Sequence, residues 1–213
     1  MTYYRKHGMN SEIYLHSDEA DSEDNGINFK VASKFLKRLH EAEQKSTDKI
    51  IAHTSTIGGE WADGMSIFAN ISYSSLPVYM IGHGCLCSMG TIILQAASKR
   101  YLMPNCDIMV HFGDLTLSGH QVSVESGTKY YIKVKNQMID IYTDKCIKGS
   151  FFKDRSYSRA RTKAYIKRKL ESSVDWYMSA QEAVDFGFAD KVLTRTEYLN
   201  VREIKKRNNR GTK

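Results

Sequence analysis

The sequence predicts an α/β fold in which helices cover a largely parallel sheet, and three observations lead to this prediction. Helical and strand patterns alternate along the first half of the chain, which is typical of layered α/β proteins. Glycine-rich joints at residues 57–60 and 81–91 follow two apolar strand patterns. With 213 residues, of which 41% are apolar, the chain is long enough to bury one sizeable core. We therefore expect a single domain over residues 1–213.

The elements of the N-terminal half follow from apolar spacing and from turn residues. In chain order we expect a strand at residues 12–16, an acidic loop until residue 28, a helix at 29–44, a strand at 49–54, a helix at 64–71, a strand at 78–81 and a helix at 91–97. Ligand sites in such folds lie at the carboxyl ends of the strands. Both glycine-rich joints are expected at that edge.

The C-terminal half continues with two short strands and a long amphipathic helix. The expected elements are strands at 100–103 and 107–112, a helix at 122–147, a helix at 179–187, a closing strand at 189–193 and a flexible basic tail at 194–213. The helix at 179–187 has the clearest boundaries, because Ser179 and Glu182 form the pattern of a capping box and Gly187 is a typical helix stop. The core is therefore expected at residues 12–193.

The composition of the chain indicates the cellular compartment. No apolar run reaches the roughly 20 residues that span a bilayer, and the N-terminus lacks the apolar stretch of a signal peptide. The four cysteines do not form the pattern of a disulfide framework, so we expect free thiols. These observations predict a cytoplasmic protein without a membrane partner.

The formal net charge of +7 raises the possibility of a nucleic-acid partner. Most of the excess lies in two segments, residues 153–169 and 201–213. No zinc-finger spacing, aromatic RNA-binding signature or helix-turn-helix pattern accompanies them. We therefore interpret both segments as solvated surface and expect no nucleic-acid partner.

Two residues at expected strand ends could act together in catalysis. Ser88 starts a predicted helix, where free backbone N–H groups favour developing negative charge, although serine at this position is commonly a helix cap. His111 follows the apolar run of the next strand and could equally be a buried structural imidazole. Together they form the arrangement in which a histidine base activates a hydroxyl nucleophile.

A third group would have to orient the imidazole and stabilise its cation. The acidic candidates downstream are Glu171 and Asp175. A metal site at Cys85 and Cys87 is the alternative use of this region, but few convergent ligands accompany these cysteines. We therefore expect no metal and no small cofactor.

Several ordered motifs resemble the family of the Clp protease proteolytic subunit, ClpP. "GCLCSMGTIILQAASKRYLMPNCDIMVH" is similar to the family's signature region, in which a serine in a G-x-x-x-S-M-G run is followed by a "PN" turn and a strand ending in M-x-H. "STIGGEWADGMSIF" and "WYMSAQEAVDFGFADKVL" match its upstream and downstream segments. The similarity covers about residues 12–193 and implies the ClpP/crotonase fold, with stacked βαβ units and a protruding helical handle that includes residues 148–169.

The resemblance also implies roles for individual residues. Ser88 matches the nucleophile, His111 the general base, and Gly59 and Met89 the positions whose N–H groups form the oxyanion hole. Counting back from the aromatic residue of the "YMSA" match places the catalytic acid on Glu171. An alignment shifted by one helical turn would place it on Asp175 instead.

The implied activity is that of a serine endopeptidase that hydrolyses peptides and unfolded proteins through an acyl-enzyme. The implied partners are further copies of the chain, in one heptameric ring or two, and polypeptide substrates. Little sequence precedes the first strand, where the family has the loops that engage a AAA+ unfoldase, so that partnership stays open. Two alternatives also stay open. One is an inactive ring subunit, for which the change to glutamate at position 171 would be the reason. The other is an acyl-CoA enzyme of the crotonase type, which shares the fold and the paired N–H donors.

Overall fold

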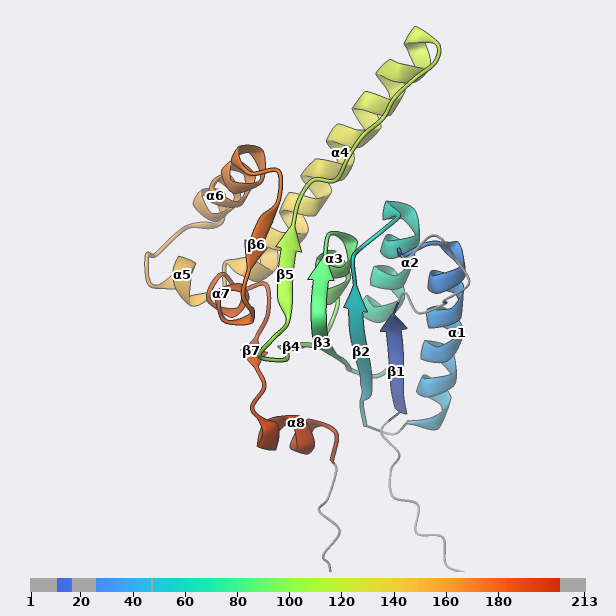
Figure 1. Ribbon diagram of the computed structural model, residues 1–213, viewed down its shortest axis with the longest axis vertical. Helices are drawn as coiled ribbons and strands as arrows, with labels where there is room; N and C mark the ends of the chain where they lie inside the picture. The colour runs from blue at the N-terminus through green and yellow to red at the C-terminus, as the bar shows by residue number, and fades with distance from the viewer. Residues whose placement is uncertain (1–10, 17–25, 47, 204–213) are drawn as a thin grey trace, which may run out of the picture.

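The computed structural model of the chain describes residues 11–16, 26–46 and 48–203 (Figure 1). Its strands are β1 (Ser11–His16), β2 (Ile50–Thr56), β3 (Val78–Cys87), β4 (Lys99–Leu102), β5 (Asp107–Val110), β6 (Trp176–Met178) and β7 (Lys191–Val192). Its helices are α1 (Phe29–Lys45), α2 (Trp61–Ser72), α3 (Met89–Leu94), α4 (Gln121–Cys146), α5 (Ser150–Lys153), α6 (Arg159–Ser172), α7 (Ala180–Asp185) and α8 (Arg195–Val201). The mixed α/β architecture confirms the predicted fold class.

The strands form one sheet that is parallel except at one pair. The order along the sheet is β1-β2-β3-β4-β7, while β5 pairs with the far part of β3 and carries β6 as an antiparallel neighbour. The central strand β3 is longer than its apolar run at 78–81 predicts. Its first half pairs with β4 and its last residues, Cys85–Cys87, pair with β5. Apolar periodicity does not reveal this second half, because its pairing partner lies about 20 residues further along the chain.

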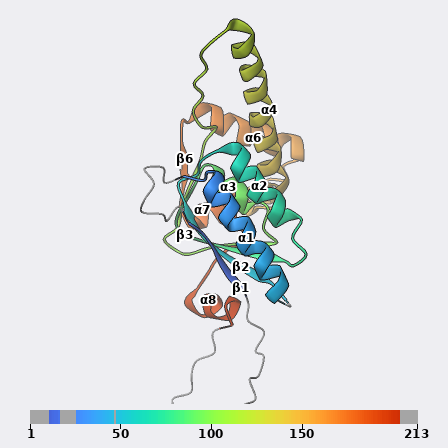
Figure 2. The same cartoon turned by 90° about the vertical axis from the view of Figure 1, so that its right-hand side faces the viewer.

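Helices α1, α2 and α3 cover one face of the sheet, and Figure 2 shows α1 beside α2 on that face. The Asn28 side chain caps α1 by accepting a hydrogen bond from the Val31 N–H at 3.1 Å. Below this cap the helix buries Phe35 and Leu39 in the main core. The main core starts between these helices and strands β1, β2 and β3 and continues to the buried residues Tyr142 of α4 and Ile166 of α6, and it fixes the strand ends that carry the site.

One half of helix α4 is buried and the other half is exposed to solvent. Tyr142 and Cys146 near its C-terminal end are fully buried, whereas Val122 and Tyr130 in its N-terminal half are 62% and 57% exposed. Figure 1 shows this N-terminal half extending away from the rest of the molecule. The protruding part is therefore α4, while the basic segment 148–169, which we expected in the handle, forms α5 and α6 and packs beside the buried half of α4.

The C-terminal elements include two that the sequence did not predict, β6 and α8. Helix α7 has the predicted capping box between Ser179 and Glu182, and Gly187 follows it with a φ of 81°. The expectation of a flexible tail from residue 194 is wrong over α8, which starts with a second capping box between Thr194 and Glu197. Residues 204–213 of that tail and residues 17–25 of the predicted acidic loop lie outside the described residues.

Two further features concern the whole chain. All four cysteines are free thiols, as expected. Among the described helices, none combines the length and the apolar character that a membrane span requires.

Candidate active site

Three neighbouring strands place their carboxyl ends at the same edge of the sheet. Strand β2 leads into Gly58 and Gly59, β3 leads into Ser88, and β5 leads into His111. The parallel pairing of Thr56 with Leu86 aligns the first two ends, and β3 pairs in parallel with β5 in the same way. The residues predicted from separate motifs are thus brought to one edge of the sheet.

Ser88 has an unusual backbone conformation. Its φ of 51° and ψ of −121° are strained for a residue with a side chain, and its N–H donates to the carbonyl oxygen of Met109 at 2.8 Å. The hydroxyl makes no capping hydrogen bond to α3, which starts at the next residue. An ordinary helix cap would use its side chain in that way, so the interpretation of Ser88 as a cap is not supported.

The paired glycines lie directly against Ser88. Gly58 and Gly59 have φ values of 102° and 146°, which residues with side chains rarely adopt. A Cβ atom on Gly58 would lie 2.6 Å from the Cβ of Ser88, and one on Gly59 would lie 2.3 Å from the backbone nitrogen of Ile27. Backbone hydrogen bonds hold the pair in place, from the Ile27 N–H to Gly58 at 2.6 Å and from the Glu60 N–H to Ile27 at 2.7 Å.

Two backbone N–H groups beside Ser88 are free to bind a ligand. In the part of the chain that the structure describes, neither the N–H of Gly59 nor that of Met89 donates a hydrogen bond to a protein atom. Gly59 and Met89 also line the same cavity as Ser88. Two such donors can stabilise negative charge on an oxygen atom bound between them.

His111 contacts a carboxylate, and the carboxylate is Asp175. The distance from His111 Nδ1 to Asp175 Oδ1 is 3.1 Å, and the two side chains are 21% and 35% exposed. The antiparallel pairing of β5 with β6 explains this contact, because Val110 pairs with Trp176 and the next residues outward are His111 and Asp175. With Nδ1 held by the carboxylate, Nε2 is the nitrogen left for a substrate or a nucleophile.

Glu171 lies elsewhere. It belongs to the last turn of α6, its side chain is 50% exposed, and its carboxylate lies 3.8 Å from Lys167 one turn earlier. The structure therefore differs from the expectation that Glu171 orients His111, and it agrees with the alternative alignment to Asp175. The sequence patterns did not predict β6, a strand of three residues. The register with which it pairs to β5 determines which acid lies beside the histidine.

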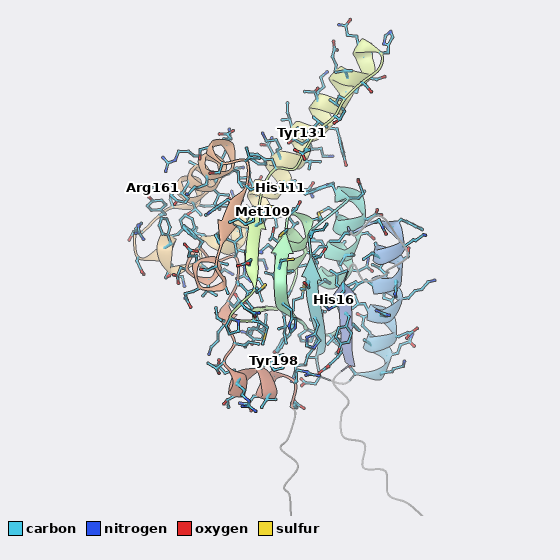
Figure 3. All side chains as sticks on the ribbon, in the orientation of Figure 1. His16, Met109, His111, Tyr131, Arg161 and Tyr198 are labelled. Carbon is cyan, nitrogen blue, oxygen red and sulfur yellow. The ribbon has the colours of Figure 1, made fainter. Side chains whose placement is uncertain are left out.

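A cavity of about 510 Å³ opens at this edge of the sheet. Ser88 and His111 both line it, although no hydrogen bond joins their side chains among the described residues. Its walls include Ile92, Val134 and Met138, so apolar residues of α4 line the cavity. Figure 3 shows His111 at the end of β5, between the labelled Met109 and Tyr131.

The segment after His111 is fixed against α4 along the rim of the cavity. The Tyr131 hydroxyl donates to the carbonyl oxygen of Gly113 at 3.2 Å, and the Lys135 ammonium lies 4.0 Å from the centre of the Phe112 ring. Helix α4 therefore positions both a wall of the cavity and residues 112–113, which border it.

The neighbouring cysteines are poor nucleophiles. Burial raises the pKa of the Cys87 thiol to about 11, and the nearby Cys85 raises it further in the same direction. Burial likewise raises the pKa of Cys106 to about 12. Neither thiol is ionised at neutral pH, and no cluster of potential metal ligands occurs among the described residues.

Comparisons with known proteins find similarity to one protein family. The model of the Clp protease family matches residues 23–196. The ATP-dependent Clp protease proteolytic subunit 2 of Pseudomonas aeruginosa is 26% identical over 170 residues, which cover 79% of this chain and 77% of that protein. The ATP-dependent Clp protease proteolytic subunit of Deinococcus radiodurans is 28% identical over 155 residues, 72% of this chain and 69% of that protein.

Proposed function

Because the chain belongs to the Clp protease family, we propose that it is a serine endopeptidase that hydrolyses peptides and unfolded polypeptides. In this proposal Ser88 is the nucleophile, His111 is the general base and Asp175 is the carboxylate that orients His111. The N–H groups of Gly59 and Met89 form the oxyanion hole. Asp175 takes the role that the sequence comparison had first given to Glu171.

One observation carries this proposal. The contact of 3.1 Å between His111 Nδ1 and Asp175 lies at the same edge of the cavity as Ser88, which has a strained backbone and whose hydroxyl has no hydrogen-bond partner among the described residues. A carboxylate at Nδ1 fixes the tautomer in which Nε2 is free to accept a proton. A purely structural histidine would not need a hydroxyl and two free N–H groups beside it.

The acylation step follows from these positions. His111 Nε2 removes the proton from the Ser88 hydroxyl while Oγ attacks the carbonyl carbon of the peptide bond. The carbonyl oxygen gains the negative charge and binds the N–H groups of Gly59 and Met89, each worth about 10²–10³ in rate in comparable sites. The proton on His111 then passes to the leaving nitrogen, and the acyl chain stays on Ser88 as an ester.

Deacylation repeats these steps with water. His111 takes a proton from a water molecule as its oxygen attacks the ester, and it returns that proton to Ser88 Oγ as the acid leaves. Asp175 stays ionised throughout and stabilises the imidazolium in both halves of the reaction. Besides the peptide and this water molecule, the proposed cycle uses side chains and backbone groups of the chain.

The cavity walls support a polypeptide substrate. Ile92, Val134 and Met138 give the space beside Ser88 an apolar surface, which suits an apolar side chain on the acyl side of the cleaved bond. The relatives are named as subunits, and we propose that copies of this chain assemble into one heptameric ring or two in the cytoplasm. Partnership with a AAA+ unfoldase is compatible with the names of these relatives, which call them ATP-dependent.

The two alternatives lose support. The inactive subunit depended on glutamate as the third catalytic residue, and an aspartate lies beside His111. An acyl-CoA enzyme of the crotonase type would use the paired N–H groups but would have no need for Ser88 and His111.

A fluorophosphonate probe tests the proposal directly. We expect wild-type protein to react at Ser88, with the modified peptide identified by mass spectrometry, and we expect Ser88→Ala to remain unlabelled. The Glu171→Gln variant is the matched control and should react like the wild type. Absence of labelling in well-folded wild-type protein, or labelling at another residue, would contradict the proposed role of Ser88.

A further inference from the structure

Two buried hydroxyl groups connect the inner half of α4 with the backbone of Ser88. The hydroxyl oxygens of Tyr142 in α4 and Thr91 in α3 lie 2.7 Å apart, and the Thr91 hydroxyl donates to the carbonyl oxygen of Ser88 at 2.6 Å. Both side chains are completely buried. We call these two hydroxyl groups the hydroxyl bridge.

The direction of both hydrogen bonds follows from the acceptor at the end of the bridge. A carbonyl oxygen only accepts, so the single proton of the Thr91 hydroxyl points at Ser88. The Tyr142 hydroxyl must then donate to Thr91 Oγ1. Burial raises the pKa of the Tyr142 phenol, so the phenol keeps this proton at neutral pH. Two aligned O–H groups therefore point toward one carbonyl oxygen.

The carbonyl group of Ser88 belongs to the same peptide unit as the N–H group of Met89. A trans peptide unit is planar, and its C=O and N–H bonds point in opposite directions. A contact that holds the oxygen therefore also fixes the direction of the N–H bond. The Met89 nitrogen lies beside the paired glycines, since a Cβ atom on Gly58 would lie 3.1 Å from it. The hydroxyl bridge thus acts on one of the two donors of the proposed oxyanion hole.

The contribution of Tyr142 distinguishes this arrangement from an ordinary helix contact. Threonine hydroxyls in helices often bond to a carbonyl three or four residues earlier, as Thr143 does with Ile139 at 2.6 Å. The Ser88 carbonyl oxygen also accepts the backbone N–H of Thr91 at 3.0 Å, so it would have a partner without the bridge. The hydroxyl that α4 adds polarises the Thr91 hydroxyl and strengthens its hydrogen bond to Ser88.

We propose that Thr91 and Tyr142 are positioning residues for the oxyanion hole, an inference that rests on the proposed catalysis at Ser88. Their hydroxyls hold the peptide unit between Ser88 and Met89 in one orientation. They also draw electron density toward its oxygen, which makes the Met89 N–H a stronger donor. Neither hydroxyl contacts the substrate or gives up its proton. Helix α4, which forms a wall of the cavity, thereby also contributes to the rate of the reaction.

A double variant removes the bridge without leaving a buried hydroxyl unpaired. Valine and phenylalanine have nearly the shapes of threonine and tyrosine, and replacing both partners of a buried hydrogen bond by apolar groups of the same shape costs little stability. We therefore expect T91V/Y142F to unfold at nearly the same urea concentration as the wild type. Thr91→Val alone should be less stable, because the buried Tyr142 hydroxyl loses its acceptor.

Peptide hydrolysis measures the effect of the bridge on catalysis. T91V/Y142F should lower kcat about tenfold and leave KM nearly unchanged, because the bridge acts on a donor to the charged intermediate rather than on substrate binding. The loss should be smaller than the factor of about 10²–10³ that removal of a whole oxyanion donor costs. Thr91→Ser keeps the hydroxyl and should recover most of the kcat that Thr91→Val loses.

Thr143→Val is the matched control for these variants. It removes another completely buried threonine hydroxyl, one that bonds to the carbonyl oxygen of Ile139 within α4. We expect kcat to stay at the wild-type value. An equal loss of kcat in Thr143→Val and in T91V/Y142F would overturn the inference, because catalysis would then respond to any change in the packing of α4.

Nuclear magnetic resonance of the Met89 backbone gives a second readout that needs no catalysis. A hydrogen bond to a peptide oxygen withdraws electron density from the nitrogen of the same peptide unit, so loss of the bridge should move the Met89 ¹⁵N resonance upfield. We expect this shift in T91V/Y142F but not in Thr143→Val, using protein labelled with ¹⁵N-methionine and the absence of the signal from Met89→Leu as its assignment.

The two readouts separate this inference from the proposed function. A Met89 resonance that T91V/Y142F does not move, or a kcat of this variant equal to that of the wild type, would overturn the role of the bridge. Absence of hydrolysis by the wild-type protein would instead contradict the proposed function, and the Met89 resonance would then decide whether the bridge polarises the peptide unit.

Discussion

At the scale of single residues, the proposed catalysis depends on which acid orients His111. Asp175 and Glu171 lie four positions apart in the sequence, and only Asp175 lies beside the imidazole. The sequence alone makes both residues candidates and favours Glu171, whereas the structure favours Asp175. The deciding fact is the register of β5 against β6, a long-range pairing that local patterns do not encode.

We expect Asp175→Asn to lower kcat for peptide hydrolysis by up to about 10⁴, because the amide would favour the wrong tautomer of His111. Glu171→Gln should change kcat little, since its contact with Lys167 is an exposed pair within one helix. Steady-state kinetics of both variants check this prediction, with circular dichroism to confirm folding. Equal loss in both variants, or a silent Asp175→Asn, would contradict the assignment.

At the scale of elements, buried polar contacts connect strand β4 with the loop before β7. Arg100 of β4 is 5% exposed, and its guanidinium group contacts the carboxylate of Asp190 before β7. The same group donates to Gln95 at 2.7 Å and to the carbonyl oxygen of Gly187 at 2.8 Å. One side chain thus joins the end of α3, strand β4 and the loop between α7 and β7.

Asp190→Asn should lower the free energy of unfolding by roughly 3 kcal/mol, because it leaves a buried guanidinium group without its counter-charge. Asp144→Asn is the matched control, since it breaks an ion pair of Arg159 that is exposed on both sides, and it should cost at most about 1 kcal/mol. Urea unfolding curves measure both changes. A similar cost for the two variants would mean that burial does not strengthen the Arg100 contact.

The helices and the parallel strands were predictable because their apolar spacing and caps are local features. The capping box at Ser179 and the helix stop at Gly187 agree with their predicted positions. Strand β6 has three residues and α8 lies in a polar segment, so neither carries a periodic apolar signal. The positive φ of Ser88 also escaped prediction, because no local sequence pattern encodes it.

At the scale of the whole molecule, a histidine cluster on the face of the sheet that carries α8 links stability to pH. His53 is 3% exposed, and its Nδ1 lies 2.9 Å from Nε2 of His83. The cluster also includes His16 and an ion pair between Glu12 and Arg202 of the turn after α8. Burial, followed by the neighbouring His83, lowers the pKa of His53 from 6.5 to about 4.

We therefore expect the protein to lose stability as the pH falls from about 6.5 to about 4. In this window the unfolded chain protonates His53 while the folded chain does not, so protons favour unfolding, by on the order of 3 kcal/mol in total. Burial also lowers the pKa of His83, which acts in the same direction. The lowered pKa of Glu12 acts at lower pH, because its stabilisation is lost only as the carboxylate becomes protonated.

Urea unfolding at several pH values between 7 and 4.5 measures this dependence in the wild type and in His53→Gln. The variant should show a flatter profile, with the remaining slope due to His83. A wild-type profile that does not change over this range, or one that rises toward low pH, would contradict the neutral, buried state of His53.

The central proposal is that Ser88 is the nucleophile with which a Clp-type serine protease hydrolyses peptide bonds. The measurement that tests it most directly is kcat/KM for a peptide with an apolar residue on the acyl side, compared among wild type, Ser88→Ala and Cys87→Ser at equal native mass. We predict turnover by the wild type, near-complete loss in Ser88→Ala and near-normal turnover in Cys87→Ser, whose thiol is protonated at neutral pH. Turnover by Ser88→Ala close to that of the wild type would contradict the central claim.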